Sequence, residues 1–208
     1  MLSRGNASKS KSQIAEEVAA LGGSYGAQSR REGSFYWFDL QNQDVRRGIS
    51  LLGEMVTTPT FQDNEVELAK EQISQEHEKN HLDYQNTLIE NVHYNSFREH
   101  QIGQPKKGDR DNVQNLNSDM LREFYSANYY GDNTIVIGVG NINHDEFVQQ
   151  VQDSFSSLHK EATAPTKNTE KAIYVPALLF IRDDEMYNSN VGVFYDAPSA
   201  KHPDFYSF

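Results

Sequence analysis

Two histidines and a glutamate in one short run have the spacing of a catalytic metal site. In His77-Glu78-x-x-His81 the two imidazoles stand four residues apart, and residues at that spacing lie on one face of a helix. Two such imidazoles can share a zinc ion, while the glutamate between them acts as general base toward a metal-bound water. Taken literally, the pattern predicts a self-contained zinc enzyme that uses His77 and His81.

The residues around this run favour a different interpretation. Helices that bind zinc in this way usually bury the ligand face against apolar neighbours, whereas Ser74-Gln75 and Lys79-Asn80 flank the histidines here. The alternative is that both histidines belong to a solvated helix face. Further along, the run Lys106-Lys107-Gly108-Asp109-Arg110 is interpreted as a solvated loop without a chemical role.

Glu76 stands out by its position on the helix. Val66, Ala69, Ile73 and Glu76 step by three, four and three, so the carboxylate takes the next position of the apolar stripe. Burying a carboxylate is costly unless a cation, a metal or several donors compensate it. The other possibility is that the helix reaches the surface near residue 76 and the carboxylate is merely solvated. Periodicity alone leaves both open.

Composition bounds the class of protein. The 208 residues hold 30 Asp and Glu against 19 Lys and Arg, which gives a net charge of −11 and argues against nucleic-acid binding. Cysteine is absent, which excludes disulfides and thiolate metal sites. No apolar run reaches the roughly 18 residues needed to span a bilayer, so we expect no direct membrane span.

Hydrophobic periodicity predicts a mixed chain of helices and strands. Helices are expected at 14–21, 45–56, from Asp63 through Val92, from Ser118 and at 144–155, and strands at 35–38, 134–140, 173–181 and 191–195. The polar stretch 160–171, which has no periodicity, reads as a linker.

Several short segments, in this order and spacing, resemble one family. They are Leu21-Gly22-Gly23, Ala27 to Glu32, Glu76 to Asn80, Asn112 to Leu121, Gly138-Val139-Gly140 with His144, Ala197-Pro198 and His202-Pro203-Asp204. Together they resemble the pitrilysin/insulinase-type peptidases, in particular processing-peptidase β subunits and the core proteins of respiratory complex III. The resemblance covers nearly the whole chain and implies an α+β fold, a mainly antiparallel sheet packed against helices, as half of a pitrilysin-like subunit.

The resemblance also implies which glutamate matters. Family members hold zinc with an inverted His-x-x-Glu-His motif and a distal Glu roughly 76 residues beyond its second His. Here the matching position is Glu76, which implies that it corresponds to the third zinc ligand, whereas His77 and His81 have no metal role. The inverted motif would precede Met1, so zinc is expected only if such an upstream segment exists. The family's second acidic residue, seven positions earlier, is replaced by Ala69, which leans against full peptidase competence.

A substrate-binding segment follows from the same resemblance. Gly26, Ala27, Gln28 and Ser29 match a strand at a sheet edge, to which an extended peptide can add as a further strand. An ordinary turn into the aromatic strand 35–38 is the alternative. We expect a first unit over residues 1–159 that lacks its beginning, a linker at 160–171 and an incomplete second unit over 172–208. The chain would be a fragment or a short, non-catalytic paralogue.

Two functions remain compatible with these residues. One is a core, scaffold subunit of complex III on the matrix side of the mitochondrial inner membrane, paired with a homologous subunit and with cytochrome-bearing subunits. The other is a fragment of a zinc metalloendopeptidase that removes basic, extended presequence peptides. No complete active site stands in this sequence, so enzymatic activity is left undecided.

Overall fold

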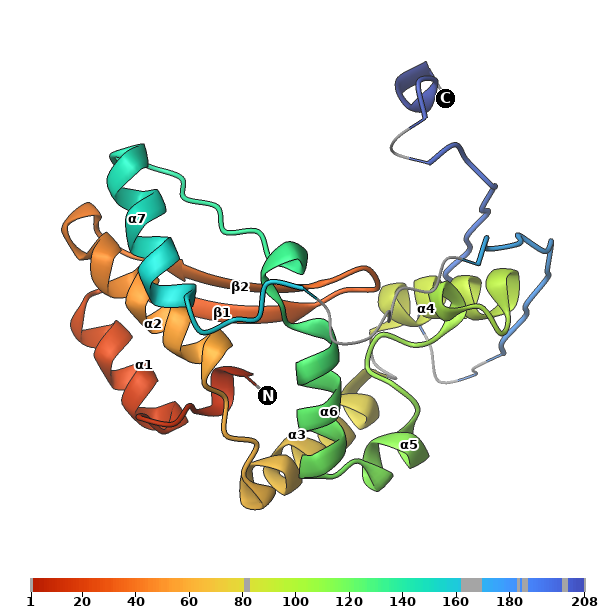
Figure 1. The fold of residues 1–208 in the computed structure, drawn as a ribbon. Helices are drawn as coiled ribbons and strands as arrows, with labels where there is room; N and C mark the ends of the chain where they lie inside the picture. The colour runs from red at the N-terminus through yellow and green to blue at the C-terminus, as the bar shows by residue number, and fades with distance from the viewer. Residues whose placement is uncertain are drawn as a thin grey trace. The chain divides into compact units, whose positions relative to one another are not determined.

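The computed structural model describes residues 2–80, 83–161, 170–182, 184, 187–199 and 202–207 (Figure 1). Its helices are α1 (Lys11–Ala20), α2 (Val45–Thr57), α3 (Asp63–Asn80), α4 (Tyr84–Phe97), α5 (Arg110–Asn115), α6 (Ser118–Asn128) and α7 (His144–Phe155), and its strands are β1 (Ser24–Ser29) and β2 (Ser34–Asp39). The chain divides into two compact units. Unit one comprises Met1–Gln72 with Asp111–Asn168, and unit two comprises Ile73–Arg110 with Thr169–Phe208.

The core of unit one forms where α1 and α2 meet the β1–β2 hairpin. Ser10 caps α1 in a capping box with Gln13, which fixes where the helix begins. One turn later Ile14 and Val18 are buried together with Leu51 and Met55 of α2, each at most 1% exposed. The inner face of the hairpin, with the aromatic residues Tyr25, Tyr36 and Phe38, packs against this cluster.

Helices α6 and α7 complete unit one. Tyr125 of α6 donates its hydroxyl hydrogen to the Val56 carbonyl oxygen at 2.7 Å, and its ring lies 5.7 Å from that of Phe61. α7 lies along α2 (Figure 1), so close that a Cβ added to Gly53 would come within 2.7 Å of the Ser154 carbonyl oxygen. Gly53 thus permits the close approach of these two helices.

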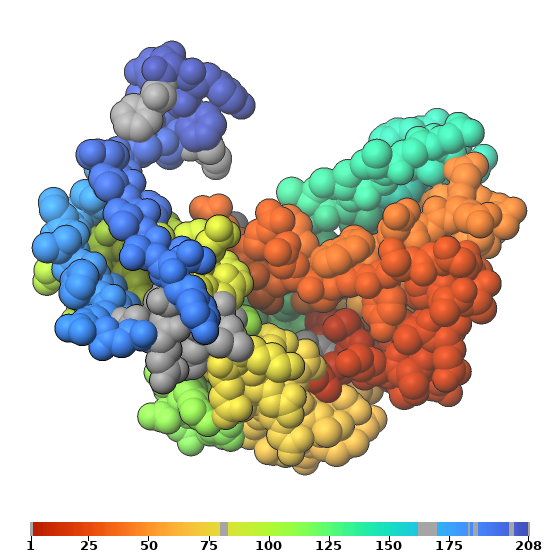
Figure 2. Space-filling model, turned by 180° about the vertical axis from the view of Figure 1, so that it is seen from behind, coloured from red at the N-terminus to blue at the C-terminus, as the bar shows by residue number. Residues whose placement is uncertain are grey.

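Unit two is built on α4. Val175 donates its backbone N–H to the Ser96 carbonyl oxygen at 2.9 Å, and the rings of Tyr174 and Phe97 meet edge to face at 6.2 Å. Tyr174 in turn donates a hydrogen bond to the Phe194 carbonyl oxygen at 3.3 Å. The blue segment after residue 170 lies at the surface of this unit in Figure 2. Among the described residues, no helix is both long and apolar enough to cross a membrane.

The fold class is confirmed, but three of the predicted strands are wrong. The described part of 134–140, 173–181 and 191–195 contains no strand, and most of its apolar residues are exposed: Ile135 is 86%, Val139 94% and Leu178 97% exposed. β-Branched composition favours a strand only where a neighbouring strand pairs with it. The sheet that the structure describes consists of β1 and β2 alone.

Two other predictions have mixed outcomes. The long helix expected from Asp63 through Val92 is two helices, α3 and α4, and residues 81–82 between them lie outside the described residues. Of the predicted linker at 160–171, residues 162–169 also lie outside them.

Candidate functional site

Glu76 lies in the C-terminal half of α3, where the helix comes to the surface. Val66 near the start of the helix is 3% exposed, whereas the Glu76 side chain is 41% exposed. Its Oε2 atom lies 3.3 Å from Nζ of Lys107. Glu76 is therefore neither deeply buried nor merely solvated, the two possibilities that periodicity left open: a lysine from the same unit pairs with it.

The run 106–110 supplies this lysine from an exposed loop that leads into α5. Lys106 contacts Glu90 of α4 at 3.3 Å, Lys107 contacts Glu76 and Arg110 contacts Glu78 at 3.6 Å. The predicted solvated loop is confirmed, since Lys106, Lys107 and Arg110 are exposed, but its three ion pairs were not predicted. The signal available in the sequence was three basic residues within five positions, opposite a helix rich in glutamate.

Lys107 also acts on the start of α4. Asp83 caps this helix by accepting a hydrogen bond from the Asn86 backbone N–H at 3.1 Å. Chiefly this bond, followed by the one from the Asn86 side chain, holds the pKa of the Asp83 carboxyl below its usual range, and the positive charge of Lys107 adds to the effect. Lys107 therefore pairs with Glu76 of α3 and also acts, more weakly, on the N-cap carboxylate of α4.

The literal His77/His81 pattern stays a prediction. His81 lies outside the described residues, and Nε2 of His77 is buried without a hydrogen-bond partner in the described part of the chain. Within the same described ranges no group of three His, Asp or Glu side chains is placed to hold a metal ion. A catalytic zinc needs about three protein ligands. One carboxylate beside a lysine does not fit that requirement by itself.

The predicted peptide-binding residues Gly26, Ala27, Gln28 and Ser29 all lie in β1, which pairs with β2 in antiparallel register. The turn that follows is closed by the Arg30 N–H, which donates to the Gly33 carbonyl oxygen at 2.8 Å. Hydrogen-bonded and non-bonded pairs alternate along such a ladder. Gln28 and Gly26 therefore bond to β2, and Ala27 and Ser29 turn their N–H and C=O groups outward.

The outer face of the hairpin is aromatic. Phe35 and Trp37 of β2 are 49% and 47% exposed, and the Arg30 guanidinium lies 4.6 Å from the centre of the Phe35 ring. The Trp37 ring covers Gly26, where any Cβ would overlap it. Gly26 is thus needed for packing within the hairpin.

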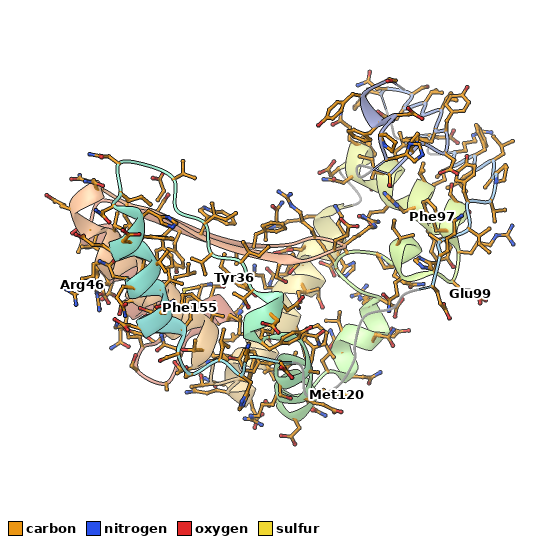
Figure 3. The ribbon with its side chains drawn as sticks, turned by 45° about the horizontal axis from the view of Figure 1, so that its top comes forward. Tyr36, Arg46, Phe97, Glu99, Met120 and Phe155 are labelled. Carbon is orange, nitrogen blue, oxygen red and sulfur yellow. The ribbon has the colours of Figure 1, made fainter. Side chains whose placement is uncertain are left out.

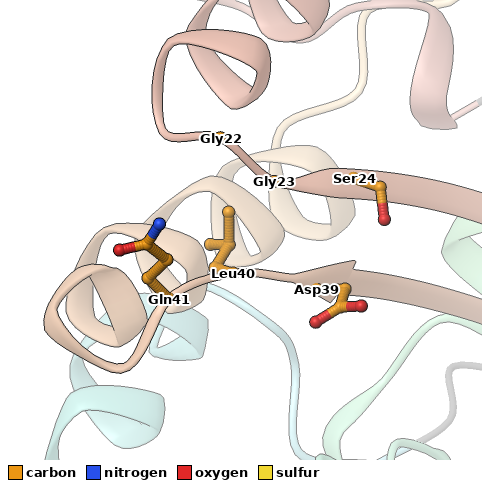
Figure 4. Close-up of a pocket in the computed structure, with 6 residues that line it drawn as sticks. All are labelled: Gly22, Gly23, Ser24, Asp39, Leu40 and Gln41. Carbon is orange, nitrogen blue, oxygen red and sulfur yellow. The ribbon is translucent and has the colours of Figure 1, made fainter.

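An open hollow of about 320 Å³ lies at the other end of the hairpin, lined by Gly22, Gly23, Ser24, Asp39, Leu40 and Gln41 (Figure 4). A Cβ on Gly23 would come within 2.6 Å of the Asp39 carbonyl oxygen, so the two strand ends meet there through backbone. Asp39 is the single ionisable group of this lining. The hollow is the gap at the base of the hairpin, and it offers no set of groups for catalysis.

Two family profiles together match nearly the whole chain. Insulinase (peptidase family M16) matches residues 1–110, and the peptidase M16 inactive domain matches residues 115–208.

Curated relatives show the same similarity at low identity. The mitochondrial-processing peptidase subunit beta of Neurospora crassa is 21% identical, with 98% of this chain and 44% of that protein covered. Subunit 1 of the mitochondrial cytochrome b-c1 complex is 22% identical in Rattus norvegicus, with 97% and 42% covered. The names place these relatives in the mitochondrion, and the chain spans less than half of their length.

Solved structures confirm the fold. A protease from Helicobacter pylori aligns with a TM-score of 0.70 at 16% identity, and a peptidase M16 inactive domain from Pseudomonas fluorescens with 0.71 at 19%. Each alignment covers 81% of this chain and 41% of the other. With its first half matched by one profile and its second half by the other, this chain belongs to the insulinase family of peptidases, family M16.

Proposed function

We propose that this chain is part of a core subunit of respiratory complex III, on the matrix side of the mitochondrial inner membrane. In this role it supports the complex and does not cut peptides. It pairs with a homologous subunit and contacts the cytochrome-bearing subunits. The similarity to subunit 1 of the b-c1 complex supports this proposal, and the similarity to the processing-peptidase β subunit supports the same ancestry.

Ala69 is the observation that carries the scaffold role. α3 is continuous from Asp63 to Asn80, and residues seven apart on a continuous helix share one face, two turns from each other. The position two turns before Glu76 therefore presents a methyl group where the family resemblance implies a carboxylate. Without it, a metal held by Glu76 would lack a supporting acidic group, and such supporting groups are typically worth about 10- to 100-fold in metal affinity or activity.

A second function is favoured by the edge of β1. In that reading, the chain belongs to a zinc endopeptidase whose upstream His-x-x-Glu-His segment supplies the remaining zinc ligands and the general base. An extended presequence then pairs with the outward N–H and C=O groups of Ala27 and Ser29. The acidic charge of the chain, −11, suits a basic presequence.

Native purification distinguishes the two functions. The endogenous protein, tagged at its C-terminus, is purified in mild detergent, and haem absorbance, intact mass, zinc content and cleavage of a presequence peptide are measured. We expect cytochrome b and c absorbance, a homologous subunit in equal amount and no cleavage. A complex that lacks haem, contains about one zinc per subunit and cleaves the peptide would reject the scaffold role.

A matched variant makes the cleavage assay specific. Glu76→Gln removes the predicted metal ligand and should abolish any genuine zinc-dependent cleavage. Glu78→Gln, two residues further along the same helix, should leave such cleavage intact. If the literal pattern of His77, Glu78 and His81 held the metal, the two variants would exchange these outcomes.

A further inference from the structure

We propose that Lys107 is the built-in counter-ion of Glu76. The Lys107 ammonium forms an ion pair with the carboxylate that the family resemblance assigns to zinc. The cation at this carboxylate therefore comes from the chain itself. The inference deepens the scaffold function proposed above and rests on it. It concerns residues of unit two alone, because Ile73–Arg110 contains both partners.

A tight turn sets the direction of the lysine. Gly108 donates its N–H to the Pro105 carbonyl oxygen at 3.0 Å, which closes a four-residue turn with Lys106 and Lys107 at its centre. Gly108 has φ of +77°, a conformation that glycine adopts without strain. The two central side chains point to different helices, Lys106 to α4 and Lys107 to α3. The turn therefore ties the two helices together and leaves Lys107 beside Glu76.

Lys107 and a metal ion compete for the same carboxylate oxygens of Glu76. A dication bound by Glu76 would sit within a few ångströms of the Lys107 ammonium, which lies 3.3 Å from Oε2. Two positive charges that close repel each other, so a metal could bind only after Lys107 had moved away.

Exposure limits the strength of the pair. The side chains of Lys107 and Glu76 are 37% and 41% exposed, so water and salt screen their attraction. The expected effect of breaking the pair is local opening of the turn, and amide hydrogen exchange measures local opening directly. Exchange in peptides covering residues 104–110 and 73–80 is the readout, in the natively purified complex.

The variants form a double-mutant cycle. Lys107→Met and Glu76→Gln should each raise exchange in the turn about two- to fivefold, the size expected of an exposed ion pair, and the double variant should exchange no faster than either. Lys107→Arg should restore protection. Lys106→Met is the matched control: the same turn, a side chain of similar exposure at 38%, but paired with Glu90, so its effect should add to that of Glu76→Gln.

Hydrogen exchange measured after treatment with a metal chelator is the decisive experiment. Chelation should leave exchange in the wild-type turn and in residues 73–80 unchanged, because Lys107 holds Glu76. Faster exchange after chelation, or additive effects of Lys107→Met and Glu76→Gln, would overturn the proposal. These outcomes do not depend on cytochromes: the pair can fail in a haem-containing complex, and the scaffold role can fail while the pair holds.

Discussion

The hydroxyl group of Tyr36, a residue of β2 that is labelled in Figure 3, lies 2.7 Å from that of Tyr129, the residue that follows α6. Burial, and then the hydrogen bond with Tyr129, raise the pKa of Tyr36 far above its usual value. The sequence marked Tyr36 as part of an aromatic strand. It could not predict this partner, because the two residues stand 93 positions apart and nothing local links them.

Tyr36→Phe tests this pair. The variant leaves the Tyr129 hydroxyl without its partner and should lower the free energy of unfolding by about 1 kcal/mol near neutral pH. The raised pKa also predicts that the contribution of Tyr36 to the free energy of unfolding is fully present below the unfolded tyrosine pKa of about 10. This contribution falls as the pH rises above that value.

Urea unfolding at neutral pH and at about pH 11 measures both effects. Tyr36→Phe should lose less stability than wild type between the two pH values, because it lacks the group that the folded state keeps protonated. Equal slopes in wild type and Tyr36→Phe would contradict the prediction.

At the level of elements, the sequence predicts helices better than strands. The 3.6-residue period of Ile14, Val18 and Leu21 gives α1, and the same reasoning gives α2 and α7. A helix satisfies its hydrogen bonds locally, whereas a strand depends on a neighbouring strand that is often far away in the sequence. The strand expected at 134–140 has the right composition but no paired strand in the described structure.

The packing of α7 on α2 gives a prediction with an internal control. Alanine gains about 1 kcal/mol over glycine in a helix. At Gly53 the new Cβ would meet the Ser154 backbone at 2.7 Å, whereas at Gly48 it would meet the end of the Leu40 side chain at 2.5 Å. A backbone cannot rotate away, but the end of a leucine side chain can.

Gly53→Ala should therefore destabilise the protein by about 1–2 kcal/mol, because overpacking costs about 1–3 kcal/mol and outweighs the gain in helix propensity. Gly48→Ala should stay within about 1 kcal/mol of wild type. Denaturant unfolding of the two variants compares them directly. A Gly53→Ala variant at least as stable as Gly48→Ala would show that α7 does not lie against α2 at this position.

At the level of the whole molecule, family membership could be recognised from the sequence. The division of the chain into compact units could not be predicted in the same way. The family profiles change between residues 110 and 115, whereas each compact unit combines two separate stretches of chain. The predicted division at 160–171 stays a prediction. Likewise Glu76 as a metal ligand and 26–29 as a peptide-binding strand rest on the resemblance, since ligands and partners are not properties of local sequence.

Hydrogen exchange on the 208-residue chain tests the strand that the structure does not show. Amides of Ile135, Ile137 and Val139, residues that are 77–94% exposed, should exchange at nearly unprotected rates. Amides at Leu51 and Met55 in the buried core of α2 should be strongly protected and serve as the internal standard. Slow exchange at 135–139 would restore the buried strand that the sequence predicts.

The hairpin also gives this protein an optical property. Trp37 is the single tryptophan of the chain, and its half-exposed indole lies over Gly26 on the outer face of the hairpin. Indole emission moves to shorter wavelength when water is removed from around the ring. Any molecule that binds to this face and excludes water from the ring will therefore shift the emission wavelength of the protein's own fluorescence. Assembly at the hairpin can thus be followed in unlabelled protein, in real time.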